Sequence, residues 1–201
     1  AAAYPYPELA GVGVAFKLLQ GLAAKKPELE GPLWENIDLV ALGTIADVVP
    51  LLGENRVLVK EGLKQMAKTA NTGLQALINQ TGLAGKRIEA GHISYILAPR
   101  VNAVGRLGDP TVALRLFLEE NPVRAGKLAV LLETMNRKRQ RIEEKVQQEA
   151  EKLITVSGPV GKALVLAGPW HPGVLGIVAA RLTEKYYRPT VLLSLEGDRA
   201  R

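Results

Sequence analysis

The feature that most constrains the fold is an unbroken helical pattern between about residues 122 and 155. Asn121 suits an N-cap and Pro122 the first helical position. Apolar residues recur from Leu128 to Leu153 at spacings of three, four and seven. About 33 residues at 1.5 Å each form a rod of roughly 50 Å, well beyond the usual helix of about 8 to 20 residues. Such a helix is a coiled coil or a connector, and the change of composition after it favours a connector between two domains.

The segments on either side of this helix differ in pattern. Residues 9 to 121 carry apolar residues at helical spacing and are interrupted by Gly, Asn and Pro, which predicts a series of helices. Beyond it, "ALVLAG", "GVLGIVAARLTEKYY" and "PTVLLSL" predict a strand, a helix and a strand, the βαβ unit of an α/β domain. One such unit cannot close a core, and the helical part has no sheet. We therefore expect an internal fragment of a larger protein.

Composition narrows the class of protein. The chain of 201 residues has no cysteine, which excludes disulfides and thiolate metal sites and favours a cytoplasmic protein. It has no apolar run of about 20 residues, so we expect no membrane partner. The net charge of +6 favours a polyanionic partner.

Asp47 ends an apolar stretch, "IDLVALGTIA", whose residues are hydrophobic nearly all round and so predict a buried helix. Two interpretations of this carboxylate are open. It caps the following turn or pairs with Arg56, or it is a desolvated metal ligand delivered from a helix end into a cleft. Hard divalent cations need several oxygen ligands, so a metal site here would take its other ligands from elsewhere.

Three polar residues, Arg100, Asn102 and Arg106, lie in "LAPRVNAVGRLGDP", where Gly105 and Gly108 loosen the backbone. Guanidinium groups match phosphate oxygens, and an asparagine can orient a base edge or a backbone. Solvated or helix-capping roles are the alternative interpretation.

His171 follows the first predicted strand and precedes the last predicted helix, a position where anions bind readily. Its neighbour Trp170 is either a stacking platform for a base or a buried aromatic residue at the seam between the two domains. The basic run "NRKRQR" (136–141) on the long helix is either a solvated face paired with Glu143 and later glutamates, or a stripe that tracks phosphates.

Four segments in this order resemble the RecJ family of single-strand-specific 5′→3′ DNA exonucleases, within the DHH phosphoesterase superfamily. They are "DLVALGTIADVVPLLGENRVLVKEGL", "ILAPRVNAVGRLGDPTVAL", "NRKRQRIE" and "GPWHPGVLGIVAARLTEKYYRPTVLL". The resemblance covers about residues 4 to 201. It implies an α/β fold: residues 1–121 as the mostly helical C-terminal part of a DHH domain, 122–156 as the interdomain helix, and 157–201 as the start of a DHH-associated domain.

The resemblance also implies roles for single residues. Asp47 matches the last acidic motif of the family, a catalytic ligand of Mn²⁺ or Mg²⁺. Arg106 matches a phosphate-facing arginine, with Arg100 and Asn102 as supporting residues, and His171 lies in a motif that faces the DNA cleft.

The function that the resemblance implies is two-metal hydrolysis of single-stranded DNA to mononucleotides, 5′→3′, in DNA repair and recombination. The expected partners are single-stranded DNA, a DNA helicase and a single-strand-binding protein. The family's other acidic motifs do not occur in this sequence, so we expect this chain alone to be inactive. The alternatives are another DHH phosphoesterase acting on short oligonucleotides and a non-catalytic DNA-binding scaffold.

Overall fold

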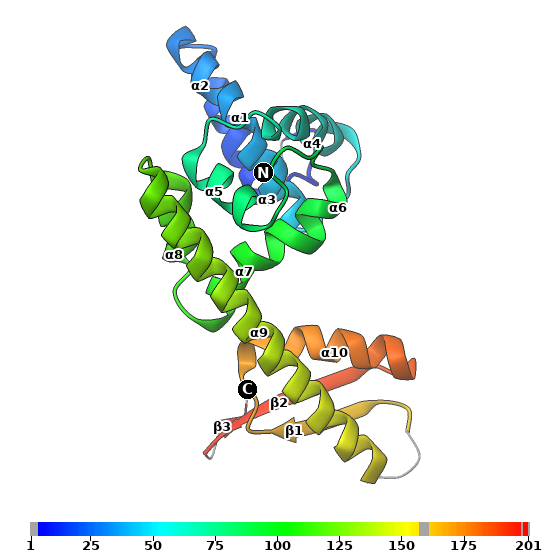
Figure 1. Ribbon diagram of the computed structural model, residues 1–201. Coiled ribbons are helices and arrows are strands. Elements are labelled where there is room, and N and C mark those ends of the chain that lie inside the picture. Colours follow the sequence, from blue (N-terminus) through cyan, green and yellow to red (C-terminus); the bar gives the residue numbers. More distant parts are fainter. Residues whose placement is uncertain (1–3, 157–160, 198, 201) are drawn as a thin grey trace. The chain divides into compact units, whose positions relative to one another are not determined.

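The computed structural model of the chain describes residues 4–156, 161–197 and 199–200 (Figure 1). The protein is mostly helical (69%) with a small sheet, which confirms the predicted fold class. It divides into two compact units: unit 1 comprises residues 1–105 and 109–133, and unit 2 comprises residues 106–108 and 134–201. The long helix α9 (Pro122–Val156) belongs to both units, whereas the sequence-based division treats it as a connector. The predicted domain boundaries therefore remain a prediction.

Unit 1 is a succession of helices joined by short turns. They are α1 (Gly11–Ala23), the short 3-10 helix η1 (Pro27–Leu29), α2 (Glu30–Glu35), α3 (Ile37–Ala46), α4 (Gly53–Met66), α5 (Thr72–Gln80), α6 (Ala90–His92), the π-helical segment η2 (Ile93–Leu97), α7 (Ala98–Leu107, whose last two residues belong to unit 2), α8 (Thr111–Leu118) and the first third of α9.

Helix α3 lies at the centre of unit 1, and its apolar residues are buried on several sides, as its sequence predicts. Helix α4 packs closely against it at Gly62. A Cβ atom built on Gly62 would overlap the side chain of Ala41 and the carbonyl oxygen of Ile37, both on α3. The missing side chain thus sets how near the two helices approach.

Replacing Gly62 therefore tests this contact. We expect Gly62→Ala to lower the free energy of unfolding by about 1 to 3 kcal/mol, because backbone atoms of α3 cannot move aside. Gly126→Ala is the matched control, since Gly126 is also inside a helix but has open space around its Cβ position. It should raise stability by about 0.5 to 1 kcal/mol. Urea unfolding measures both changes, and equal effects would contradict a close helix contact at Gly62.

Asp38, in the first turn of α3, is a fully buried carboxyl group. Its Oδ1 accepts a hydrogen bond from the backbone N–H of Leu39 at 2.7 Å, whereas Oδ2 has no partner among the described residues. Burial raises the pKa of Asp38 above its usual range, because the charged form loses its hydration.

The raised pKa predicts a pH dependence of stability. A carboxyl group with a raised pKa in the folded state stabilises the fold at low pH, and this contribution disappears as the pH rises through that pKa. Asp38→Asn stays neutral, so its stability relative to the unchanged protein should increase between pH 4 and pH 7, by up to about 1.4 kcal/mol per pH unit within the titration range. Urea unfolding at both pH values measures this difference. The raised pKa would be contradicted if the stability of Asp38→Asn relative to the unchanged protein stayed constant or decreased between pH 4 and pH 7.

Unit 2 contains the predicted βαβ unit. Strand β1 (Leu164–Gly168), helix α10 (Pro172–Tyr186) and strand β2 (Thr190–Glu196) follow one another, and the short β3 (Arg199–Ala200) pairs antiparallel with β2. The strands β1 and β2 are parallel, with Leu164 opposite Thr190 and Gly168 opposite Ser194. The sequence prediction of two parallel strands joined by a helix is confirmed.

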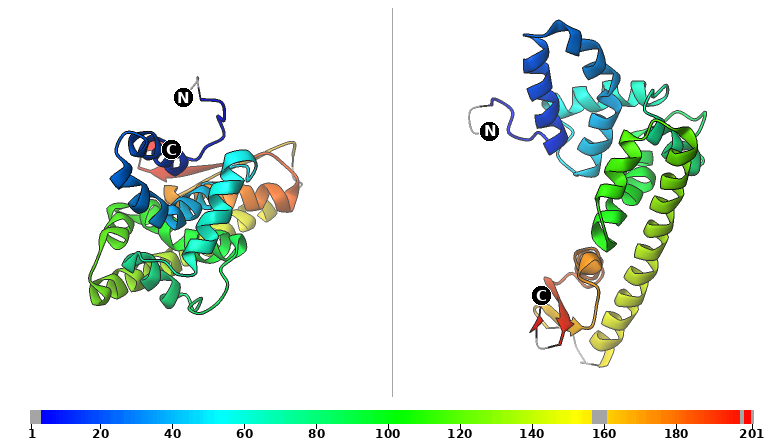
Figure 2. Two further views of the ribbon diagram at one scale, coloured as in Figure 1. Left: turned by 90° about the horizontal axis from the view of Figure 1, so that it is seen from above. Right: turned by 90° about the vertical axis from the view of Figure 1, so that its left-hand side faces the viewer.

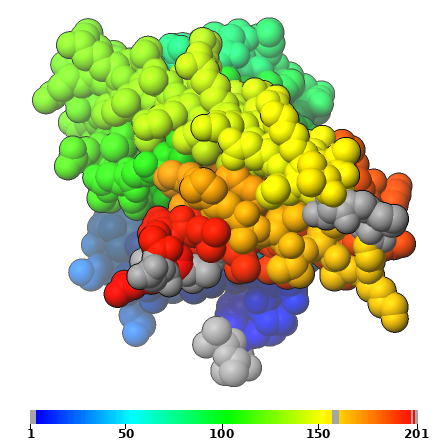
Figure 3. Space-filling model, turned by 90° about the horizontal axis from the view of Figure 1, so that it is seen from below, coloured from blue at the N-terminus to red at the C-terminus, as the bar shows by residue number. Residues whose placement is uncertain are grey.

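One face of this small sheet is covered and the other is not. The buried core combines residues from the second part of α9, from β1 and β2, and from α10. The right view of Figure 2 shows helix α10 end-on beside the strands. Val165 on β1 and Val191 on β2 are instead exposed. In Figure 3 the strand segments, amber to red, are accordingly seen at the surface of the unit.

A buried carboxylate joins α9 to α10. Glu143 is only 2% exposed, and it forms ion pairs with Arg139 four residues earlier on α9 and with Arg181 on α10. Arg139 also donates to the side chain of Asn136 at 3.0 Å. The predicted i,i+4 pairing is confirmed for Arg139 and Glu143, but the expectation that it lies on a solvated face is wrong, because the pair is largely buried in unit 2.

Candidate functional site

Asp47 is the C-terminal cap residue of α3, where its backbone N–H donates to the carbonyl of Gly43 at 3.0 Å. Its side chain is exposed, so the expected desolvation is wrong: the chain leaves the core at this residue. The carboxylate has no hydrogen-bond or ion-pair partner within the described ranges, and the pairing with Arg56 is absent there. Val48 follows with a φ of 58°, a strained conformation for a β-branched residue and one that turns the chain sharply after the carboxylate.

A cavity of about 640 Å³ in unit 1 brings Asp47 together with Asn102 of α7. The other polar side chains of its lining include Asn36 and Asn71, neither of which was a candidate from the sequence. Asn71 caps α5 by accepting from the N–H of Leu74 at 2.8 Å, and it donates to the carbonyl of Phe117 at 2.9 Å. Asn36 donates to the carbonyl of Pro32 at 2.9 Å.

These contacts separate two kinds of polar group in the cavity wall. Asn36 and Asn71 hold the local fold, since their amides are engaged by backbone groups. Asn102 is exposed, and its side chain, like the carboxylate of Asp47, bonds to none of the residues that the structure describes. Asp47 and Asn102 are therefore the polar side chains of this wall that are available to a ligand.

Arg100 does not join them. The segment that contains it is helical (α7), and residues two apart on a helix project to opposite sides, so Arg100 and Asn102 diverge. The guanidinium of Arg100 forms an ion pair with Glu133 of α9 at 2.5 Å and donates to the carbonyl of Ile96 at 2.5 Å. Within unit 1 it links α7 to α9.

Arg106 and His171 meet at the first turn of α10 in unit 2. His171 is the N-cap residue, and its Nδ1 accepts from the N–H of Gly173 at 3.1 Å. Arg106, near the end of α7, donates to the carbonyl of Gly173 at 3.3 Å. A Cβ atom on Gly173 would overlap the backbone oxygen of Arg106, so only glycine permits this approach. The remaining N–H groups of Arg106 and the Nε2 of His171 are left beside a helix N-terminus.

Trp170 is a structural residue rather than an exposed stacking platform. It is 4% exposed, and its indole N–H donates to Glu149 of α9 at 2.8 Å. The buried hydroxyl of Ser194 donates to its carbonyl at 2.6 Å. The burial of Trp170 is confirmed, within the core of unit 2, and these contacts anchor the segment that carries His171.

Among the described residues, no group of three or more His, Cys, Asp or Glu side chains is arranged to hold a metal ion. A membrane-spanning helix is likewise not found within those residues.

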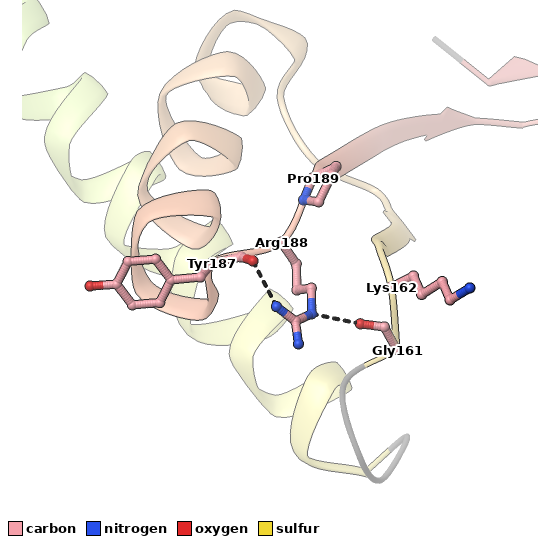
Figure 4. A pocket seen from close by; sticks show the side chains of 5 residues that line it. All are labelled: Gly161, Lys162, Tyr187, Arg188 and Pro189. Carbon is pink, nitrogen blue, oxygen red and sulfur yellow. Dashed lines mark hydrogen bonds between the residues drawn. The ribbon is translucent and has the colours of Figure 1, made fainter.

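A further hollow, of about 580 Å³, lies in unit 2 (Figure 4). Arg188 lines it but donates to the carbonyls of Gly161 at 3.0 Å and Tyr187 at 2.9 Å. Figure 4 shows the side chains of Lys162 and Tyr187 pointing in opposite directions. This hollow has no convergent polar groups and is not a candidate site.

The curated proteins to which this chain is similar belong to one class of enzyme, the single-stranded-DNA-specific exonucleases. They are RecJ proteins. The chain is 44% identical over 185 residues to RecJ of Thermus thermophilus, covering 92% of this chain and 27% of that protein. It is 39% identical over 197 residues to RecJ of Bacillus subtilis, covering 98% of this chain and 24% of that protein. No protein-family model matches the chain.

Solved structures agree with the sequence relatives. The crystal structure of Thermus thermophilus RecJ in complex with Mn²⁺ has a TM-score of 0.85 and 40% identity, and the match covers 99% of this chain and 31% of that one. A structure of exonuclease RecJ bound to manganese has a TM-score of 0.82 and 40% identity, covering 98% of this chain and 52% of that one. This chain is therefore a part of a RecJ-like protein, and it spans about a quarter of the length of the curated relatives named above.

The contacts of Arg100 and Arg106 predict effects of different size on stability. Arg100→Gln removes a short ion pair with the 12% exposed Glu133 and should lower the free energy of unfolding by about 2 kcal/mol. Arg106→Gln removes an exposed, long hydrogen bond and should change stability by less than about 0.5 kcal/mol. Urea unfolding compares the two variants, and similar losses would contradict this assignment of Arg100 to the fold.

Proposed function

We propose that the protein containing this chain is a cytoplasmic, metal-dependent exonuclease that hydrolyses single-stranded DNA from the 5′ end to mononucleotides. In this proposal residues 1–121 and 157–201 are parts of two domains, with 122–156 as the helix that connects them. Its partners are single-stranded DNA and, during repair and recombination, a helicase and a single-strand-binding protein. The observation that carries the proposal is the cavity wall where Asp47 and Asn102 have unengaged side chains, in a chain whose relatives are named for this activity.

Asp47 fits a ligand of Mg²⁺ or Mn²⁺. Its carboxylate is an exposed oxygen donor that the described part of the protein does not engage, and hard divalent cations prefer such donors. A cation needs several ligands, so the other carboxylates come from elsewhere in the protein. When bound, the metal ions lower the pKa of a water molecule and stabilise charge on the leaving oxygen. Asn102, in the same wall, can donate its amide N–H groups to a phosphate oxygen.

Arg106 and His171 are proposed to contact the DNA backbone. The guanidinium of Arg106 keeps donors beyond the one that it gives to Gly173, and the α10 N-terminus beside it favours anions. His171 uses Nδ1 as the helix cap, which leaves Nε2 for a phosphate oxygen. Arg100 has a supporting role that acts through α7, because its ion pair with Glu133 holds the helix that carries Asn102.

Replacing Asp47 in the full-length protein tests the proposal. Asp47→Asn should lower the rate of single-stranded DNA cleavage in Mn²⁺ by about a thousandfold or more, because a metal ligand supports several kcal/mol of transition-state stabilisation. DNA binding, measured by fluorescence anisotropy, should change little. The matched control is Glu144→Gln, which converts an exposed carboxylate without a described partner to an amide and should leave both quantities unchanged. Release of mononucleotides from a 5′-labelled strand measures cleavage.

Other arms of the same experiment separate the roles. Arg106→Gln should weaken DNA binding and reduce the slope of log K against log salt by about 0.7 to 1, as the loss of one phosphate contact does. This chain alone should not digest DNA, since Asp47 then lacks its partner ligands. Equal loss of cleavage and binding in Asp47→Asn, or digestion by the chain alone, would contradict the proposed role of Asp47.

A further inference from the structure

A second groove in unit 1, of about 560 Å³, shares no lining residue with the cavity of Asp47. One wall is α4, and the other is the segment that leads into α6 (Figure 1). We call it the α4 groove and define it by its cations Arg56, Lys60, Lys64 and Arg87 and by the apolar residues between them. Its volume lies in the range of about 300 to 1,000 Å³ typical of sites that hold small ligands or a few residues of a peptide.

The cations of the α4 groove lie along one face of a helix. Arg56, Lys60 and Lys64 are spaced four apart on α4, and residues at this spacing are neighbours on a helix surface. Arg87 lines the opposite wall. All four side chains are exposed, so their charges face solvent and are open to a ligand.

Most of this positive charge is not neutralised within unit 1. Lys64 pairs with Glu61 at 2.8 Å. Arg56, Lys60 and Arg87 form no ion pair with any residue in the described ranges. Glu89 is the acidic residue in the lining, and it forms a capping box with His92 at the start of α6. Three cations around one groove, each without a counter-charge, favour an anionic occupant.

The floor of the groove identifies what kind of anion fits. Val59 and Ile88, each 5% exposed, form its base, and Leu63 adds to it. No aromatic side chain is part of the lining, although stacking on aromatic rings is how proteins hold the bases of single-stranded nucleic acid. An apolar floor between cations instead suits an aliphatic side chain flanked by carboxylates.

We propose that the α4 groove binds an acidic peptide segment of a partner protein, with an aliphatic side chain on the Val59 and Ile88 floor and carboxylates paired with Arg56, Lys60 and Arg87. This is an interaction surface separate from the residues proposed for DNA hydrolysis. It recruits a partner without occupying the Asp47 cavity.

Fluorescence anisotropy tests this proposal with a labelled probe of sequence Ser-Asp-Asp-Leu-Glu-Asp and with this chain. The triple variant Arg56→Gln, Lys60→Gln, Arg87→Gln should bind the probe about ten- to a hundredfold more weakly. The control variant Arg115→Gln, Lys138→Gln, Lys152→Gln removes the same charge from exposed positions outside the groove and should bind as the unchanged chain does. A probe with Ser in place of Leu should bind more weakly to the unchanged chain. Should the triple variant fail to fold by circular dichroism, the single charge reversal Lys60→Glu replaces it, with the same expected direction.

A twelve-nucleotide poly(dT) strand supplies the competing outcome. We expect it not to displace the probe from the groove. The proposal would be overturned if poly(dT) displaced the probe from the unchanged chain and if poly(dT) binding were lost in the groove variant. The groove would then be assigned to nucleic acid. Equal weakening of probe binding in both triple variants would overturn the proposal as well, since binding would then follow net charge alone. The proposal would also be overturned if the probe did not bind to the unchanged chain.

Discussion

The structure depends on one continuous helix that is buried along part of its surface at both ends. Helix α9 contributes Ala125, Ala129 and Leu132 to the buried residues of unit 1. Its second part contributes Val146, Ala150 and Ile154 to the core of unit 2. A single helix can do this because it carries buried apolar residues toward both ends, while the buried positions between them, Asn136 and Glu143, are polar and paired with Arg139. Asn121 satisfies the first N–H groups of the helix, those of Val123 and Arg124. Each unit thus includes its own stretch of this helix in its core.

Polar groups in this protein divide into those that the fold uses and those that it leaves free. Glu143 and Arg100 lie where water is largely excluded, and each has a charged partner, because an unpaired charge there would be costly. Asn36 and Asn71 likewise satisfy backbone groups. The side chains of Asp47 and Asn102 sit at the edge of the core and satisfy none in the described part of the chain. This contrast, more than residue type, separates the candidate ligands of a metal or phosphate from structural residues of the same chemistry.

Unit 1 carries two different surfaces on this basis. The cavity of Asp47 combines a carboxylate and an amide with an apolar wall, a combination suited to a cation and a phosphate. The α4 groove combines uncompensated cations with an aliphatic floor, a combination suited to carboxylates beside an apolar side chain. α3 lines the cavity of Asp47 and α4 lines the groove, so the two surfaces lie on helices that pack against each other.

Local sequence determined the elements of the fold. The period of the apolar residues marked α3, α9 and the βαβ unit, and an N-cap with proline at the first position marked the start of α9, since these signals arise from neighbouring residues. The order of motifs also indicated the family, and with it the role expected for Asp47.

Contacts between distant residues were decided only by tertiary structure. The sequence grouped Arg100 with Asn102 and Arg106, but helix geometry turns Arg100 toward Glu133. Asp47 was expected to be desolvated, but the chain leaves the core where α3 ends. A sequence pattern reports which residues can be buried, whereas the side chains that meet depend on helix phase and packing between segments far apart in the chain.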